Sequence, residues 1–165
     1  MTALKYLSHY SPQLQSQVQQ LIDTQQLAAY VQHKYPDAHT VQTDKALYQY
    51  ASHIKKKFLK NAPQLDKVLF DNQLDVAGRA LGTNTAISRA QGAKLVAAKE
   101  IRVANLFKAA PAAFLNMIVV HELAHLKERD HNKAFYQLCC HMLPDYHQFE
   151  FDTRVYLTHL DVLND

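Results

Sequence analysis

The sequence predicts an α+β fold: a helical N-terminal part, a small antiparallel β-meander, a buried helix and C-terminal helices, in one domain over residues 1–165. Three observations support this prediction. Apolar residues recur at helical spacing before residue 60 and after residue 110. All three glycines, Gly78, Gly82 and Gly92, fall between these helical parts, among short β-prone stretches. A length of 165 residues suits one domain, and 48% hydrophobic residues suffice for a packed core.

Two helices are expected in the N-terminal part. Ser11-Pro12 is typical of a helix start, because serine caps helices and proline suits the first helical position. The helical pattern that follows continues towards Tyr35-Pro36, where proline stops it. A second helix is expected to begin near Thr43 or Asp44 and to end at Asn61-Ala62-Pro63.

The β-meander is expected between the two helical parts. Its strands are predicted at residues 68–70, 83–88, 94–97 and 101–107, with a turn at Gln91-Gly92. The periodicity of this region is weak, so the pattern indicates strands without fixing their limits.

The C-terminal part is predicted to be helical again. Pro111 opens a predicted helix that has apolar residues around most of its circumference, which indicates that the helix is buried. A further helix follows Asp130 or Asn132 and ends at Pro144. A last helix is expected from Tyr146 to Leu163.

Composition restricts the class of protein. No stretch reaches the roughly 18 to 20 apolar residues that a membrane span needs, and the first residues do not read as a signal peptide. The two cysteines, Cys139 and Cys140, are adjacent and form no disulfide framework. A cytoplasmic protein without a membrane partner is therefore expected. The net charge of +3 conceals twelve basic against four acidic residues over positions 45–108, which could attract phosphates or nucleic acid.

The segment that indicates chemistry is His121-Glu122-Leu123-Ala124-His125, an H-E-x-x-H motif on the predicted buried helix. Residues four apart lie on one helix face, so the two imidazoles can converge on one zinc ion. Glu122 lies beside these ligands and is expected to be the catalytic base that takes a proton from a metal-bound water.

A catalytic zinc site normally has three protein ligands, and His131 is the expected third. Six residues after His125 on an unbroken helix it would face away, so the helix must end between them. Asp130 and Asn132 are residues at which such a break is reasonable. Glu150 is the alternative third ligand, because it resembles the downstream glutamate of thermolysin-like enzymes.

Other polar residues are weaker candidates for the metal site. His141 and His147 are close enough in sequence to line it, and Tyr136 or Tyr146 could donate a hydrogen bond to a developing oxyanion. Adjacent thiols on a packed helix are more often core residues than nucleophiles or metal ligands, and no C-x-x-C spacing suggests a second metal centre.

The run from residue 118 to residue 128, followed by His131 and Phe135, resembles the YgjP-like family of metal-dependent hydrolases, which is related to minimal zincin metallopeptidase domains. Residues 43–50 and 149–154 resemble its short proteobacterial branch, so that the resemblance covers nearly the whole chain.

The resemblance implies a role for several residues. It makes His121, His125 and His131 the three metal ligands and Glu122 the catalytic base. It also places residues 100–104 on the edge strand beside the cleft, where zincins pair an extended substrate.

Three functions follow from these residues and from the resemblance. The first is a zinc-dependent, metallopeptidase-like hydrolase acting on peptides. The second is a nucleoside-triphosphate pyrophosphohydrolase acting on UTP, for which Arg89, Lys94 and Arg102 are candidate phosphate contacts. The third is a nucleic-acid-associated module, which the basic middle segment allows although no recognisable binding motif supports it. The sequence makes no prediction of oligomeric state.

Overall fold

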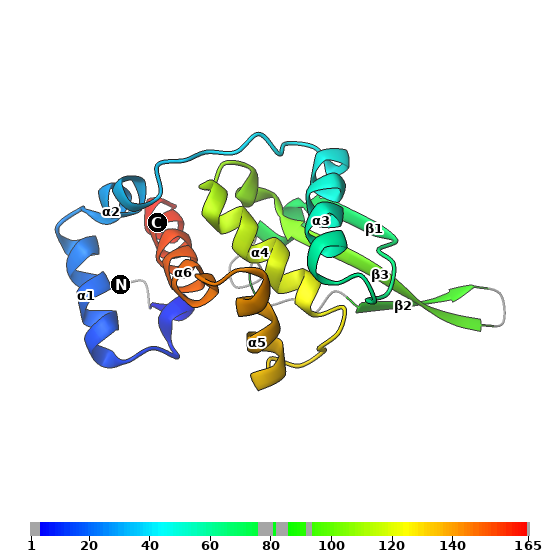
Figure 1. Ribbon diagram of the computed structural model, residues 1–165. Helices are drawn as coiled ribbons and strands as arrows, with labels where there is room; N and C mark the ends of the chain where they lie inside the picture. Colours follow the sequence, from blue (N-terminus) through cyan, green and yellow to red (C-terminus); the bar gives the residue numbers. More distant parts are fainter. Residues whose placement is uncertain (1–3, 76–80, 82–85, 92–93, 165) are drawn as a thin grey trace.

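The computed structural model describes residues 4–75, 81, 86–91 and 94–164. It confirms the α+β class, with helices at both ends of the chain and strands between them (Figure 1). Along the described residues the elements are η1 (Lys5–Leu7), α1 (Pro12–Asp23), α2 (Leu27–Lys34), α3 (Asp44–Phe58), β1 (Lys67–Asp71), η2 (Asn72–Asp75), β2 (Ala86–Gln91), β3 (Lys94–Ala104), η3 (Asn105–Lys108), α4 (Ala112–Ala124), α5 (Lys133–Met142) and α6 (Tyr146–Leu163).

Side-chain caps begin the N-terminal helices where the sequence predicts them. The Ser11 side chain accepts a hydrogen bond from the Leu14 amide at 3.2 Å and begins α1. Thr43 accepts from the Ala46 amide at 3.1 Å and begins α3. The expected continuous helix towards Tyr35-Pro36 is wrong, because the chain breaks between α1 and α2. At the break Gln25 has φ of 58°, a left-handed conformation that interrupts the helical hydrogen bonds.

The sheet has the strand order β1-β3-β2, which corrects the expected antiparallel meander. β2 pairs antiparallel with the first part of β3, but β1 pairs parallel with its second part, with Val68 opposite Ile101. The expected stretches 94–97 and 101–107 are largely one strand, long enough to pair with a different neighbour along each part. Apolar periodicity reports which face of a strand is buried and does not report strand direction, so the pattern could not reveal the parallel pair.

β3 is central in the strand order, but among the described strands its residues 100–104 pair with β1 alone, because β2 pairs only with residues 94–99. The expected edge at residues 100–104 therefore stays a prediction. One side of this segment is taken by β1 over the whole length of β1. Gly92, expected in the turn after Gln91, lies outside the described residues, as do residues 82–85 at the start of the predicted second strand.

Helix α4 lies at the centre of the molecule. It packs against β3, α3, α5 and α6, and Figure 1 shows it between the strands on one side and α6 on the other. Every residue from Met117 to Ala124 is buried, which confirms the prediction of a buried helix. His121 and Glu122 are therefore polar side chains in a packed core, where they need hydrogen-bonding or charged partners.

A buried carboxylate connects α2 and its C-terminal extension to α6. Asp152 is fully buried and accepts hydrogen bonds from Tyr30 at 2.7 Å, from Tyr35 and from Gln148 at 2.8 Å. The Lys34 ammonium lies 3.0 Å from the same carboxylate. These partners satisfy a charge that would otherwise strongly destabilise the fold.

None of the helices within the described ranges combines the length and the apolar character that a bilayer crossing requires.

Candidate metal centre

Three histidines meet where α4 ends. His121 lies in the last turn of α4 and His125 is its C-terminal cap. The chain then turns, and α5 begins after Asn132, whose side chain accepts a hydrogen bond from the Phe135 amide at 2.9 Å. The helix therefore ends between His125 and His131, as the sequence predicts, and the turn brings His131 back towards the helix end.

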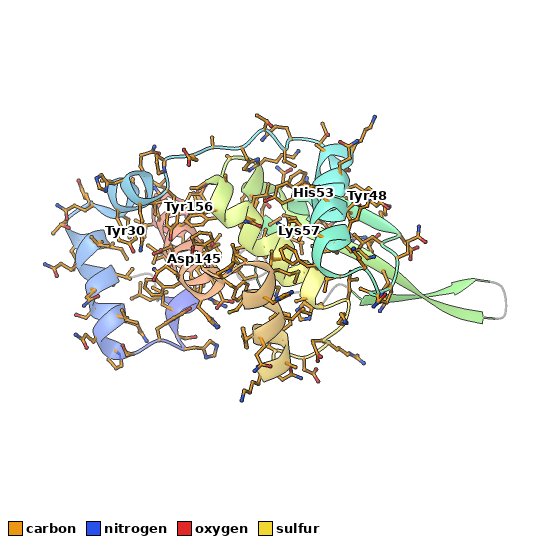
Figure 2. All side chains as sticks on the ribbon, viewed as in Figure 1. Tyr30, Tyr48, His53, Lys57, Asp145 and Tyr156 are labelled. Atoms are coloured by element: carbon orange, nitrogen blue, oxygen red, sulfur yellow. The ribbon has the colours of Figure 1, made fainter. Side chains whose placement is uncertain are left out.

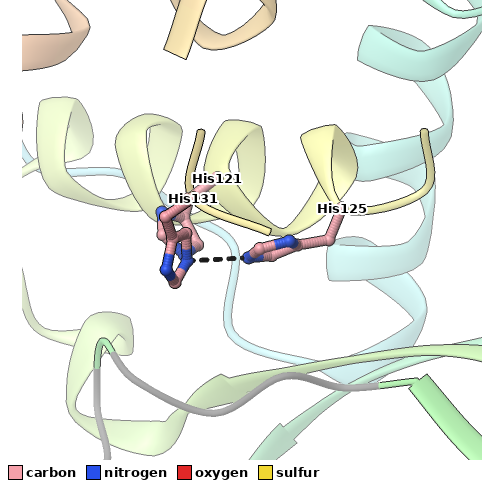
Figure 3. A group of neighbouring side chains, drawn as sticks. All are labelled: His121, His125 and His131. Carbon is pink, nitrogen blue, oxygen red and sulfur yellow. Dashed lines mark hydrogen bonds between the residues drawn. The ribbon is translucent and has the colours of Figure 1, made fainter. Parts of the chain in front are cut away.

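The ring nitrogens of the three histidines face one another (Figure 3). One nitrogen of each lies within 4.8 Å of the others, and Nε2 of His125 is 3.1 Å from Nε2 of His131. Two imidazole nitrogens this close need a positive centre between them, either a proton or a metal ion. Zn–N bonds of about 2.0–2.1 Å in a tetrahedral site separate ligand nitrogens by roughly 3.3 Å, so the donor set and its spacing fit a divalent metal ion.

The outer nitrogens of two of these rings have partners. Nδ1 of His125 donates to the main-chain carbonyl of Glu128 at 3.0 Å. Nδ1 of His121 lies 2.8 Å from the Tyr146 hydroxyl. Histidines that bind metals usually make such a contact through the ring nitrogen that does not bind the metal, because it fixes the ring orientation and the tautomer. In both rings these contacts leave Nε2 as the nitrogen available to a metal ion.

Burial keeps the inner histidines neutral. Desolvation lowers the pKa of His121 to about 3, with further lowering by the neighbouring His125 and His131 and by the positive charge of Arg154. Burial also lowers the pKa of His125. Only the neutral imidazole has a nitrogen lone pair to offer, so both rings are in the form that a metal ion requires.

Phe135 packs against all three histidine rings, a contact that the H-E-x-x-H motif does not indicate. Its fully buried ring lies with its centroid 5.0 Å from His121, 4.5 Å from His125 and 5.0 Å from His131. The signal in the sequence is an aromatic residue in the first turn of the helix that follows His131.

The two glutamates that the sequence singles out lie outside the group of three nitrogens. Glu122 is buried on α4, next to His121. Glu150, the alternative third ligand, accepts a hydrogen bond from the Tyr146 hydroxyl at 3.0 Å. Tyr146 therefore lies between Glu150 and His121, and the three-histidine group is formed without this carboxylate.

The other candidate residues differ in their distance from the centre. His147 is exposed and packs on Tyr136, with ring centroids 5.5 Å apart, and Tyr136 in turn lies 6.5 Å from His131. His141 is exposed and contacts Phe58 of α3 instead.

The cysteines and the basic residues take no part in the three-histidine group. Cys139 is fully buried, and desolvation raises the pKa of its thiol to about 12. Arg102 donates to Glu100 and to Asp71, both at 2.8 Å, so its charge is already paired. The side chains of Arg89 and Lys94, also expected to contact phosphate, lie outside the described residues.

Comparison with known proteins agrees with this geometry. Residues 13–152 match the family model described as YgjP-like, metallopeptidase domain. A protein of Escherichia coli (strain K12) named UTP pyrophosphatase is 57% identical over 162 residues, which cover 98% of this chain and 97% of that protein. No solved structure matches the chain. The chain therefore belongs to the YgjP-like family with a metallopeptidase domain and is a metal-dependent hydrolase.

Proposed function

We propose that the protein hydrolyses UTP to UMP and pyrophosphate at a zinc ion bound by His121, His125 and His131. The similarity to the UTP pyrophosphatase of E. coli supports this substrate, because at 57% identity it extends over nearly the full length of both chains. The cluster of histidine nitrogens supports a metal-dependent reaction. Three histidine nitrogen donors suit zinc and leave a fourth position open.

Zinc would supply a Lewis acid that polarises a phosphoryl oxygen and makes water easier to deprotonate. Glu122 then has the role of general base. Its carboxylate takes one proton from the attacking water, the water oxygen forms a bond to the α-phosphorus, and the bond from this phosphorus to the bridging oxygen breaks. Pyrophosphate leaves with that oxygen, and the proton on Glu122 returns to solvent or to the products.

The position of Glu122 supports this role. It is adjacent to His121 on the same helix and 4% exposed, so its carboxylate acts in a site from which bulk water is largely excluded. Electrostatic interactions are stronger in such an environment, and a positioned base contributes about 10²- to 10⁴-fold to a rate.

Peptide hydrolysis is the second candidate, because the matching family model is described as a metallopeptidase domain. The same Lewis acid and base would serve a carbonyl carbon as well as a phosphorus atom. The pairing of β3 is compatible with this reaction, since among the described strands residues 100–104 pair on one side only, with β1, and an extended peptide adds to the other side of such a segment.

Release of pyrophosphate distinguishes the two reactions. Zinc-loaded protein should release pyrophosphate from UTP faster than from ATP, GTP or CTP, and the Glu122→Gln variant should release almost none. A peptide library incubated with the same preparation should stay intact. Cleavage of peptides with no pyrophosphate from any nucleotide would move the function to the peptidase class.

A further inference from the structure

We propose that Glu150 acts through the Tyr146 hydroxyl to hold His121 in the tautomer that carries its proton on Nδ1 and leaves Nε2 free for the metal ion. Tyr146 and Glu150 are then positioning residues, which touch neither the metal ion nor the substrate. The proposal rests on the proposed function only in taking His121 as a metal ligand.

The contacts form an unbroken chain from α4 to α6. Nδ1 of His121 lies 2.8 Å from the Tyr146 oxygen, and this hydroxyl lies 3.0 Å from Oε2 of Glu150. Tyr146 and Glu150 are four residues apart on α6, so they share one helix face. Tyr146 is fully buried and His121 is 5% exposed, so water has little access to compete for these contacts.

The direction of each hydrogen bond follows from the chemistry of the three groups. A carboxylate can only accept, so the single hydroxyl proton of Tyr146 is donated to Glu150. The Tyr146 oxygen can then only accept from His121, which requires a proton on Nδ1. A neutral imidazole has one ring proton, so Nε2 carries the lone pair. Burial and the nearby Glu150 charge both raise the pKa of Tyr146, so its hydroxyl remains protonated.

The Cys139 thiol also interacts with the Tyr146 hydroxyl. It does not change the direction of the chain of hydrogen bonds, because a thiol with a raised pKa is protonated and is a much weaker acceptor than a carboxylate. The Tyr146 oxygen has a second lone pair with which it can accept from the thiol.

His125 provides a contrast within the same site. Its Nδ1 donates to a main-chain carbonyl, that of Glu128, at 3.0 Å. A carbonyl cannot donate, so this tautomer is fixed by the backbone and does not depend on any side chain. His125 is therefore an internal reference against which a change at His121 can be measured.

The tautomers can be read directly in the metal-free protein by long-range ¹H–¹⁵N correlation spectra of the imidazole rings near neutral pH. In the wild-type protein both His121 and His125 should carry the proton on Nδ1. In Glu150→Ala, the freed Tyr146 proton is donated to Nδ1 of His121, so that the proton of His121 moves to Nε2 while His125 stays unchanged.

Zinc affinity, measured by competition with a chromogenic chelator, should fall about 10- to 100-fold in Glu150→Ala, the range for loss of an outer partner. Glu150→Gln should recover much of this loss, because its amide oxygen can still accept from Tyr146. Tyr146→Phe leaves Nδ1 of His121 unpaired and should lose as much as Glu150→Ala. Tyr30→Phe is the matched control. Tyr30 lies on α2 (Figure 2), and its hydroxyl donates to the Asp152 carboxylate at 2.7 Å. Loss of this tyrosine–carboxylate hydrogen bond should leave zinc affinity at the wild-type value.

A proton on Nε2 of His121 in the wild-type protein would overturn the proposal. So would an unchanged His121 tautomer in Glu150→Ala together with zinc affinity within twofold of wild type. Both outcomes leave UTP hydrolysis by the zinc-loaded protein untouched, so the proposed function would stand. If the tautomers behave as expected but the protein hydrolyses no UTP, the proposed function is wrong and the positioning role is confirmed.

Discussion

Nε2 of His125 and Nε2 of His131 lie 3.1 Å apart although the residues are six positions apart in the sequence. On a continuous helix this separation would turn the two rings to different faces. The end of α4 at Ala124 and the cap of α5 at Asn132 bring them together instead. The turn between the helices is thus as much a part of the centre as the H-E-x-x-H motif.

His131, and not Glu150, is expected to be the third ligand of the metal ion. His131→Ala should lower zinc affinity by more than the 100-fold that marks the upper range for an outer partner, because it removes one of three nitrogen donors. Glu150→Ala should lose less, since Glu150 contacts Tyr146 and lies outside the group of nitrogens. Chelator competition on both variants measures the difference. A larger loss in Glu150→Ala would transfer the third position to the carboxylate.

Glu122→Gln should bind one zinc ion with affinity near that of wild type and hydrolyse UTP about 10²- to 10⁴-fold more slowly, because the amide cannot take a proton from water. Metal analysis and pyrophosphate release on the same sample check both halves. Asp161→Asn is the control: it removes a carboxylate charge from an ion pair with Lys5 on the protein surface and should keep full activity. Wild-type turnover by Glu122→Gln would remove the general base from the account.

The buried carboxylate of Asp152 should matter for stability and not for chemistry. Asp152→Ala leaves Lys34, Tyr30 and Tyr35 without their shared acceptor and should lower the free energy of unfolding by about 3 kcal/mol. Tyr30→Phe removes one hydrogen bond and should cost about 1 kcal/mol. Urea denaturation followed by circular dichroism measures both. Equal, small effects would mean that the contacts of Asp152 contribute little to stability.

Cys139 should be inert in the folded protein. Its side chain is fully buried, and burial raises the pKa of the thiol to about 12, so almost no thiolate exists at neutral pH. Alkylation by iodoacetamide, followed by mass spectrometry, should label Cys139 only after denaturation. Rapid labelling of Cys139 in the native protein would indicate an accessible thiol and would reopen its interpretation as a nucleophile.

Much of the helical part could be predicted from the sequence because local signals determine it. Ser11, Thr43 and Asn132 each accept a hydrogen bond from the backbone at a helix start, and proline precedes or opens α1 and α4. The break at Gln25 escaped prediction, because a left-handed conformation at glutamine has no sequence signature.

The sheet was harder to predict because its pairing depends on residues far apart in the chain. The parallel match of Val68 with Ile101 joins two segments whose order and direction no local pattern encodes. The same limit applies to the site. The motif indicates His121 and His125, whereas the contacts of Phe135 and Glu150 arise only when α5 and α6 pack against α4.

The most direct test of the account is a titration of metal-free protein with zinc while UTP hydrolysis is followed. The rate of pyrophosphate release should rise from near zero in proportion to added zinc and reach its plateau at one ion per chain. In His131→Ala the rise should require a large excess of zinc. Full activity without metal, or a wild-type titration curve in His131→Ala, would contradict the claim that the three histidines hold the ion on which hydrolysis depends.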